Sequence, residues 1–308
     1  MSSPAPTVDA AHNFPRSRRL WPGLTLAIVG SIAFSGKSIL AKLMYQHGVD
    51  AVLVITLRML FSLPVFMAMA MWAGRGKAPL TARDWRQVSL LGFTGYFAAS
   101  YFDFVGLQYI GVNLERMILY LSPTLVLMLG WVLFRRAITL RQTGAVLVGY
   151  LGVVVVFIHE AGHRNENLVL GAALVFASAL CYAVYLIFSG EAVQRLGSLR
   201  LAGLATAIAC VLTLITFALI RPMSALHAPA AVWWMSVLNA LACTVAPVLM
   251  VMMAVERIGP ALAVQAGMIG PLSTIGLSML LLNEPFTPWL ALGTALVLTG
   301  IWLLARFR

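Results

Sequence analysis

Long apolar stretches alternate with short polar ones over almost the whole chain. Each apolar stretch has about the 20 residues that a helix needs to cross a bilayer, and a pattern of this kind is typical of membrane helices. The pattern predicts ten spans, at 22–45, 51–72, 86–109, 112–134, 140–158, 168–189, 200–220, 231–254, 260–282 and 286–305. We therefore expect an all-α integral membrane protein whose partner is the lipid bilayer.

The second half of this pattern repeats the first. The Ile-Gly pair that precedes Pro123 recurs 148 residues later before Pro271. Five spans in each half is an odd number, so the second copy must enter the membrane upside down. We expect an inverted five-plus-five repeat, which is typical of secondary transporters. The expected parts are a cytoplasmic tail at 1–20, a first repeat at 21–158, an outer loop at 159–167 and a second repeat at 168–308.

Composition agrees with a membrane protein. Hydrophobic residues make up 61% of the chain and charged residues only 10%, with a mean hydropathy of +0.92. A soluble domain has about 25% charged residues, so this composition leaves no room for a sizeable soluble domain. The polar first 20 residues do not resemble a cleaved signal peptide, because the apolar stretch after them is long enough to span.

The net charge of +11 is distributed unevenly across the predicted membrane. The side that holds the N-terminus receives Arg16, Arg18, Arg19, Arg75, Lys77, Arg83, Arg86, Arg135, Arg136, Arg141, Arg195, Arg200, Arg257, Arg306 and Arg308. The other side receives Lys42, Arg116, Arg164 and Arg221. Cytoplasmic loops carry such an excess of Lys and Arg, so we expect both termini in the cytoplasm of a bacterial inner membrane. The basic charge is thus an orientation signal, and no nucleic-acid partner is expected.

Motifs for enzyme chemistry are sparse. His159 and His163 fit the H-E-x-x-H signature of zinc proteases. That chemistry needs both histidines on one stable helix together with a third ligand, whereas this pentapeptide closes a span just before a short polar loop. An intramembrane zinc protease is therefore the alternative outside transport. The three cysteines, Cys181, Cys210 and Cys243, lie within spans and are expected to pack, so we expect no metal, no cofactor and no enzyme.

Charged residues inside spans are costly and mark functional sites. Lys37, Arg58 and Asp103 all lie roughly 9–12 Å below the predicted outer boundary, and Glu115 opens the next span slightly above them. Three hypotheses remain open. Arg58 and Asp103 form a structural salt bridge; Lys37 or Arg58 faces a cavity and attracts a substrate carboxylate; or Asp103 or Glu115 is a protonation site for coupling. The repeat-related positions carry no charge, so the group belongs to the first half alone.

Polar, aromatic and methionine side chains in spans three, four, eight and nine complete the predicted cavity. Besides Lys37 and Arg58, the predicted substrate-binding residues are Tyr96, Tyr101, Tyr120, Asn239, Met250, Gln265 and Met268. Any one of them can instead pack between helices or face lipid. Pro123 and Pro271 are expected to break their helices, since a proline removes one backbone hydrogen bond and frees a carbonyl.

Several of these residues also carry a resemblance to a known family. The supporting features are the run from Leu281 to Phe286, then Gly293 and Gly300, the Arg58 early in span two, and the prolines Pro123 and Pro271. In order and spacing they resemble EamA repeats, the ten-span branch of the drug/metabolite transporter superfamily. Two departures are Arg136, where the first copy normally has Glu, and Asn283 in place of Gly. Glu284 is therefore interpreted as a loop and helix-start residue.

The resemblance implies a transporter that works by alternating access, and we expect it to act without ATP. Ten spans suffice for a complete pore, so we expect a monomer. Among the family's branches the chain is loosely similar to the YddG-type exporters of aromatic and other amino acids. We expect export of small amphipathic metabolites, with amino acids as the substrates. Efflux of cationic drugs and exchange of other metabolites, such as sugar nucleotides, are the alternatives within transport. A channel is disfavoured because no ring of charge recurs in both halves.

Overall fold

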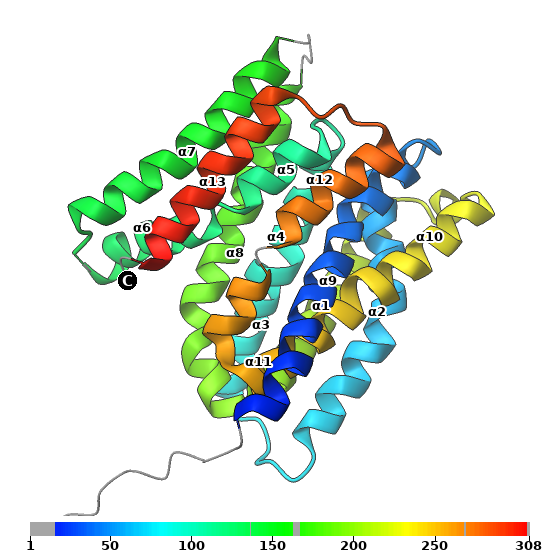
Figure 1. Ribbon diagram of the computed structural model, residues 1–308. Helices are drawn as coiled ribbons and strands as arrows, with labels where there is room; N and C mark the ends of the chain where they lie inside the picture. Colours follow the sequence, from blue (N-terminus) through cyan, green and yellow to red (C-terminus); the bar gives the residue numbers. More distant parts are fainter. Residues whose placement is uncertain (1–15, 136, 163–166, 268, 307–308) are drawn as a thin grey trace, which may run out of the picture.

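The computed structural model describes residues 16–135, 137–162, 167–267 and 269–306 (Figure 1). Within these ranges the regular secondary structure is entirely helical. The elements are α1 (Arg16–Tyr45), α2 (Ala51–Gly74), α3 (Ala82–Gly92), η1 (Phe93–Ala98), α4 (Ala99–Leu107), α5 (Val112–Leu119), α6 (Ser122–Phe134), α7 (Leu140–Ala161), α8 (Leu168–Leu196), α9 (Ser198–Ile220), η2 (Met223–Leu226), α10 (Ala230–Ala240), η3 (Leu241–Val245), α11 (Ala246–Gly267), α12 (Ile269–Leu282) and α13 (Pro288–Arg306).

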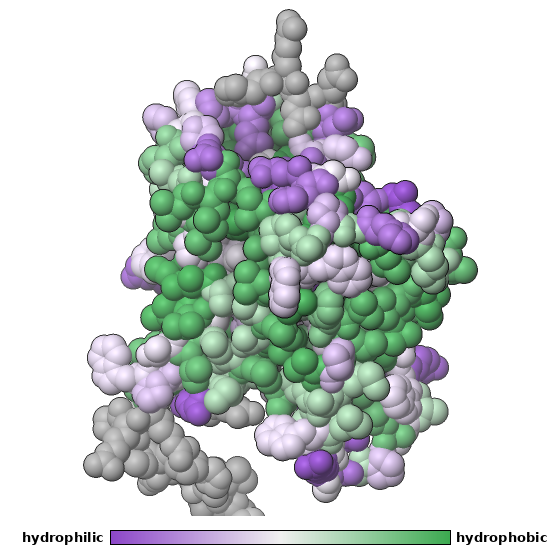
Figure 2. Space-filling view, turned by 90° about the vertical axis from the view of Figure 1, so that its right-hand side faces the viewer, coloured by the Kyte–Doolittle hydropathy of each residue, from purple (hydrophilic) through white to green (hydrophobic). Residues whose placement is uncertain are grey.

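The helices have the length and composition of membrane spans. Nine stretches of the described residues are long and apolar enough to cross a bilayer, and a shorter apolar helix covers Leu272–Leu282. That helix belongs to the predicted span 260–282, which contains Met268, outside the described residues. Figure 2 shows hydrophobic side chains over the middle of one face and hydrophilic ones gathered toward its ends. The predicted all-α membrane fold is confirmed.

Large apolar side chains point outward over this middle zone. Leu151 in the middle of α7 is 56% exposed, and Val211 in the middle of α9 is 44% exposed. In water an apolar surface of this extent would mark an interface or an aggregation site, whereas in a bilayer it contacts lipid tails of the same polarity. We call the side at which α1 ends and α13 begins the loop side, and the opposite side the termini side (Figure 1).

Helix packing follows the repeat. The helix α2 packs along α9, and α7 packs along α13, so each of these helices contacts its own counterpart in the other half. The contact of α1 with α11 likewise corresponds to the contact of α8 with α4. At the α7–α13 contact a side chain on Gly152 would lie 2.5 Å from the carbonyl oxygen of Gly293. Glycine permits this close approach of two backbones.

Two π-helical segments mark equivalent positions in the two halves. The segments η1 and η3 begin at Phe93 and Leu241, 148 residues apart. Sequence analysis predicted uninterrupted spans here, because one extra residue in a helical turn leaves the apolar pattern unchanged. Single-turn π-helical segments within α-helices are frequent at functional sites. Each π-helix contacts the first helix of the other half, η1 with α8 and η3 with α1.

The fourth span of the first half is divided in two. The helix α5 ends at Leu119, and α6 begins at Ser122 with Pro123 in its first turn. The hydroxyl of Ser122 donates to the carbonyl of Leu119 at 2.6 Å, and that of Thr124 donates to the carbonyl of Leu121 at 2.7 Å. The hydroxyl of Ser122 takes the place of the N–H that Pro123 lacks at the carbonyl of Leu119. The carbonyl of Leu121 also accepts from two backbone N–H groups of α6.

The boundary between the third and fourth spans of the second half differs from its prediction. One span was expected to end at 254 and the next to begin at 260, yet α11 is helical throughout Ala246–Gly267. A Gly-Pro pair in a sequence indicates a turn, but proline also occurs within bent helices. Pro271 lies near the start of α12, and its side chain is outside the described residues.

Candidate functional site

Five charged side chains converge in the membrane interior toward the loop side. Lys37 comes from α1, Arg58 from α2, Asp103 from α4, and Glu115 and Arg116 from α5. None is more than 7% exposed. We call these five residues the ionic cluster. With every group ionised it holds three cations and two carboxylates, so it has an excess of one positive charge.

The shortest ion pair in the cluster joins Lys37 to Asp103, with 2.6 Å between Nζ and Oδ2. This corrects the hypothesis that Arg58 pairs with Asp103. The sequence predicts one depth in the membrane for Lys37, Arg58 and Asp103. The rotation of each helix about its axis, however, decides which of these side chains meet. Asn239 of α10 supports the pair from the second half, since its Nδ2 donates to the carbonyl of Lys37 at 3.1 Å.

Glu115 and Arg116 form a second, bridged pair. The hydroxyl of Ser38 donates to Oε1 of Glu115 at 3.0 Å, and Nη2 of Arg116 donates to that hydroxyl at 2.9 Å. The Nε of Arg116 also lies 3.4 Å from Oε2 of Glu115. The two neighbours therefore offset each other's charge around a serine on α1.

Arg58 is left as the cation without a counter-ion. Its Nε and Nη2 have no hydrogen-bond partner among the described residues, and no ion pair there includes it. Its guanidinium lies 4.4 Å from the ring centre of Phe104, and Nζ of Lys37 lies 5.4 Å from the same centre. A ring face stabilises a cation only modestly, whereas burying an unpaired charge is costly.

Acceptors in and beside the cluster are also unsatisfied. Within the described part of the chain, Asp103 Oδ1, Glu115 Oε2 and Asn239 Oδ1 are buried without a hydrogen-bond partner. Buried polar atoms are normally paired, and exceptions call for an explanation such as an absent ligand or water. The site thus offers unused donors on Arg58 beside unused acceptors, an arrangement that suits a ligand with both kinds of charge.

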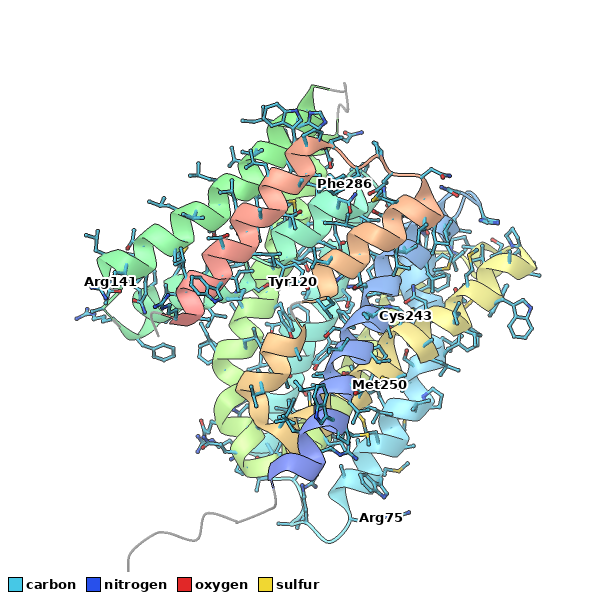
Figure 3. The ribbon with its side chains drawn as sticks, viewed as in Figure 1. Arg75, Tyr120, Arg141, Cys243, Met250 and Phe286 are labelled. Atoms are coloured by element: carbon cyan, nitrogen blue, oxygen red, sulfur yellow. The ribbon has the colours of Figure 1, made fainter. Side chains whose placement is uncertain are left out.

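A seam of hydroxyl groups continues from this site between α1 and α12. Ser35 donates to the carbonyl of Gly270 at 2.9 Å and lies 3.0 Å from the hydroxyl of Ser273. A side chain on Gly270 would lie 2.6 Å from the hydroxyl of Tyr120. Figure 3 shows Tyr120 near the centre of the molecule. The predicted residue Tyr120 therefore lies at the contact between the two halves.

The other predicted residues make different contacts. The Tyr96 hydroxyl lies 3.2 Å from that of Tyr185. The ring of Tyr101 stacks on Phe97, with 6.3 Å between the centres. Met250 lies against α1 at Gly30. The side chain of Gln265 and the whole of Met268 are outside the described residues.

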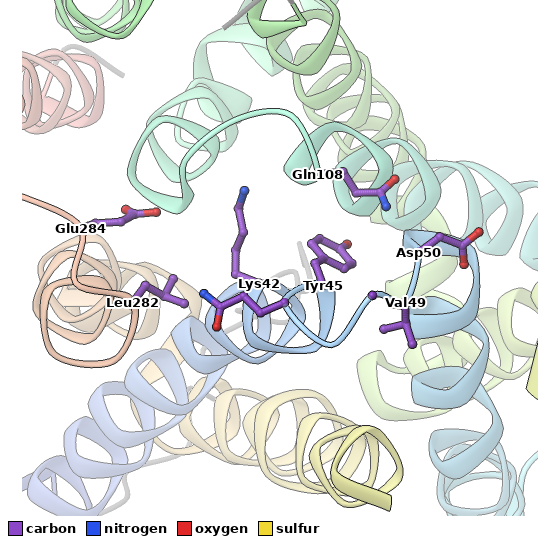
Figure 4. Close-up of a pocket in the computed structure, with 9 residues that line it drawn as sticks. Lys42, Tyr45, Val49, Asp50, Gln108, Leu282 and Glu284 are labelled. Atoms are coloured by element: carbon purple, nitrogen blue, oxygen red, sulfur yellow. The ribbon is translucent and has the colours of Figure 1, made fainter. Parts of the chain in front are cut away.

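A hollow of about 600 Å³ opens above the cluster on the loop side. It is lined by Lys42, Tyr45, Gln46, Gly48, Val49, Asp50, Gln108, Leu282 and Glu284 (Figure 4). Lys42 lies five residues after Lys37 on α1, which is about 7.5 Å along the helix axis. The hydroxyl of Tyr45 donates to the carbonyl of Phe104 at 2.8 Å. Tyr45 and Phe104 thus connect the hollow to the cluster below it.

Glu284 forms one wall of this hollow and joins the two halves. Its Oε1 accepts from the backbone N–H of Val112 at 3.0 Å, and its Oε2 accepts from Nδ2 of Asn113 at 2.7 Å. A carboxylate at a helix N-terminus satisfies a free N–H and complements the helix dipole. Glu284 therefore caps α5. The helix α13 is instead capped by Thr287, which accepts from the N–H of Leu290 at 3.1 Å, so the helix-start interpretation of Glu284 is corrected.

Sequence reasoning missed Ser38, Phe104 and Lys42 as parts of the site. Ser38 and Phe104 directly follow two predicted residues, but helical neighbours point about 100° apart, so adjacency gave no reason to include them. In the sequence, Lys42 is one of the charges that indicate the orientation in the membrane. Its spacing from Lys37 was the available signal, since both residues lie on one helix near the same membrane boundary.

The zinc-protease motif lies only partly within the described residues. The ring of His159 stacks on that of Trp289, with 6.1 Å between the centres, while His163 is outside the described ranges. Among the described side chains, no three of the types His, Cys, Asp and Glu are grouped so that they could hold a metal ion.

The fold and site are those of a multi-pass helical membrane protein built from two related halves around a buried polar centre. The model of the EamA-like transporter family matches the chain twice, over residues 21–158 and 169–306. The protein belongs to the EamA-like transporter family, and hence to the drug/metabolite transporter superfamily.

Its relatives are named as transporters. An "Uncharacterized transporter YcbK" of Bacillus subtilis (strain 168) is 27% identical over 277 residues, which cover 85% of this chain and 86% of the relative. An "Uncharacterized transporter sll1319" of Synechocystis sp. is 23% identical over 313 residues, covering 92% of each chain. A solved crystal structure with 19% identity has a TM-score of 0.60 and covers 95% of this chain and 98% of that chain. The last likeness supports the fold alone.

Proposed function

We propose that this transporter exports small amphipathic metabolites, with amino acids, aromatic ones included, as its substrates. It works by alternating access as a monomer in a bacterial inner membrane, with both termini in the cytoplasm. Family membership supports transport, and the uneven distribution of Lys and Arg supports the orientation. The substrate class rests on the ionic cluster.

The observation that carries the proposal is the unpaired guanidinium of Arg58. A substrate carboxylate would supply the missing counter-ion, in the bidentate geometry that Arg favours. Asp103 Oδ1 is an unused acceptor in the same cluster and suits a substrate ammonium group. An amino acid carries both groups on one carbon, so a single ligand would satisfy both sides of the site.

The site is closed in this structure. Arg58 is only 3% exposed, so a substrate reaches it only when helices of the two halves move apart. The hydroxyl seam between α1 and α12 supplies polar groups along one such contact. Secondary transporters place their binding sites at the contact between repeats, where rocking of one bundle opens each side in turn.

Counterflow in proteoliposomes tests this function. Vesicles are loaded with one unlabelled amino acid and labelled phenylalanine, threonine or methionine is added outside. We expect saturable exchange, reduced 10- to 100-fold in Arg58→Gln because a charge-assisted hydrogen bond contributes about 1.5–3 kcal/mol. The matched control is Arg83→Gln. Arg83 is exposed and forms its ion pair with Glu191, and neither residue belongs to the ionic cluster.

The outcomes separate the alternatives. No exchange of any amino acid by folded, monodisperse protein overturns the amino-acid assignment. Saturable exchange of a cationic drug instead would move the function to drug efflux, and uptake of sugar nucleotides to metabolite exchange. Bound zinc in purified protein, with loss of a peptide-cleaving activity in His159→Ala, would support the protease.

A further inference from the structure

Lys42 is the half-buried counterpart of the fully buried cations below it. No ion pair or side-chain hydrogen bond includes its ammonium group among the described residues. Figure 4 shows the side chain reaching into the hollow, with Glu284 on one side and Gln108 on another. A lysine at the end of a helix interacts favourably with the helix dipole, but that interaction does not use its three N–H donors.

Glu284 is the carboxylate that remains available to a ligand beside Lys42. Asp50 already pairs with Arg221, which leaves Glu284 as the carboxylate of the hollow without a cation among the described residues. Each oxygen of Glu284 accepts one hydrogen bond, whereas a carboxylate has about four acceptor positions. Glu284 therefore keeps acceptor capacity toward the hollow while it caps α5.

We propose that the hollow is a second substrate site, a vestibule in which Lys42 binds the carboxylate and Glu284 the ammonium group of an amino acid. This inference rests on the proposed function and adds a second binding site between the loop side and the ionic cluster. The volume of about 600 Å³ falls within the range of small-molecule sites. The side chains of Gln46 and Gln108 add neutral donors and acceptors at the rim.

The vestibule is connected physically to the cluster. Val112 and Asn113, which bind Glu284, are in the first turn of the helix that also carries Glu115 and Arg116. An ammonium group that binds a free acceptor position of Glu284 shares this carboxylate with the N-terminus of α5. Binding in the vestibule thereby acts on the helix that carries two of the five residues of the ionic cluster, and the amino acid advances from one site to the next.

The half-saturation concentration for amino-acid exchange, measured separately from each side of the membrane, tests the vestibule. Vesicles are sorted by whether a C-terminal affinity tag is accessible, which shows the side that faces outward. We expect Lys42→Gln to raise the half-saturation concentration for phenylalanine about tenfold from the loop side and less than twofold from the termini side. Lys42→Arg keeps the positive charge and should raise the half-saturation concentration from the loop side about threefold. Lys77→Gln is the matched control, because Lys77 donates to the carbonyl of Leu196 at the end of α8, on the termini side.

Failure of the vestibule and failure of the function give different results. If wild-type protein exchanges amino acids and Lys42→Gln shifts neither side, or both sides equally, the vestibule is overturned and the function stands. If wild-type protein exchanges no amino acid from either side, the function is overturned and the vestibule with it.

The ammonium half of the proposal has its own test. N-acetylphenylalanine keeps the carboxylate but lacks the positive charge. In wild-type protein, phenylalanine should compete from the loop side about tenfold better than its acetyl derivative, and Glu284→Gln should reduce this preference to about twofold. Gln keeps an acceptor for the N–H of Val112, so α5 remains capped. An unchanged preference in Glu284→Gln overturns the role of Glu284.

Discussion

Two regions occupy equivalent places in the two halves but have opposite chemistry. Lys37 and Phe34 on α1 correspond, 148 residues later, to Tyr185 and Tyr182 on α8. Around Lys37 lie the charges of the ionic cluster. Around Tyr185 lies a cluster of tyrosines: its hydroxyl is 3.2 Å from that of Tyr96, and its ring centre is 5.7 Å from that of Tyr182. The same backbone position thus carries ions in one half and aromatic rings in the other.

The difference shows what duplication preserves. The π-helices, helix contacts and glycine contacts recur in both halves, while Asp103 and Glu115 correspond to the apolar residues Val251 and Ala263. The backbone is thus shared by two related bundles, while the charges of the proposed substrate site lie in one of them. The tyrosine cluster packs α8 against η1.

The largest effect is expected when Lys37 is removed from the ionic cluster, because in the described part of the chain the tyrosine cluster of the second half has no such ion pair. Lys37→Met leaves Asp103 without the cation at 2.6 Å, and breaking a buried pair costs about 3–5 kcal/mol. Lys37→Met with Asp103→Leu removes both charges and should recover most of that loss. Chemical unfolding in detergent measures both variants. A loss below about 1 kcal/mol in Lys37→Met would show that Arg58 takes over Asp103 and that the cluster is not specific in its pairing.

A smaller effect is expected where each π-helix meets the opposite half. In Gly95→Ala the new methyl would lie 2.3 Å from Cγ of Tyr185, whereas in Gly36→Ala it would lie 2.8 Å from Sγ of Cys243. We expect losses of about 2–3 kcal/mol for Gly95→Ala and about 1 kcal/mol for Gly36→Ala, because overpacking costs more against a ring held by its neighbours. Thermal unfolding in detergent compares them. Gly190→Ala on α8, where the space is open, is the control. Equal losses would mean that the tyrosine cluster is no more rigid than the cysteine contact.

The fold could be predicted from the sequence because the bilayer imposes a simple rule. Each span must be apolar over about 20 residues, and that pattern survives in every segment. The duplication is visible because prolines and glycines repeat at a constant offset. The π-helices could not be predicted, since the residues of η1 and η3 are apolar or small in the same way as their neighbours.

Only part of the membership of the candidate site could be predicted from the sequence. The bilayer makes Lys37, Arg58 and Asp103 conspicuous in any sequence, but the pairing of Lys37 with Asp103 depends on helix rotation, which the spacing of charges does not give. The contact of Glu284 with Val112 joins residues 172 positions apart. Such contacts depend on how whole helices pack, and one sequence alone does not determine them.

The smallest expected effect tests whether the tyrosine cluster takes part in transport at all. Tyr185→Phe removes one hydroxyl from a 3.2 Å contact and keeps the ring against Gly95. We expect a loss of about 0.5–1 kcal/mol in the free energy of unfolding, the usual contribution of a neutral hydrogen bond, and amino-acid counterflow within twofold of wild type. A double-mutant cycle with Tyr96→Phe measures the coupling of the two hydroxyls. If Tyr185→Phe reduced counterflow as far as Arg58→Gln does, the second half would also contact the substrate. The two equivalent positions would then share one function, and the ionic cluster would be half of a binding site that the tyrosines complete.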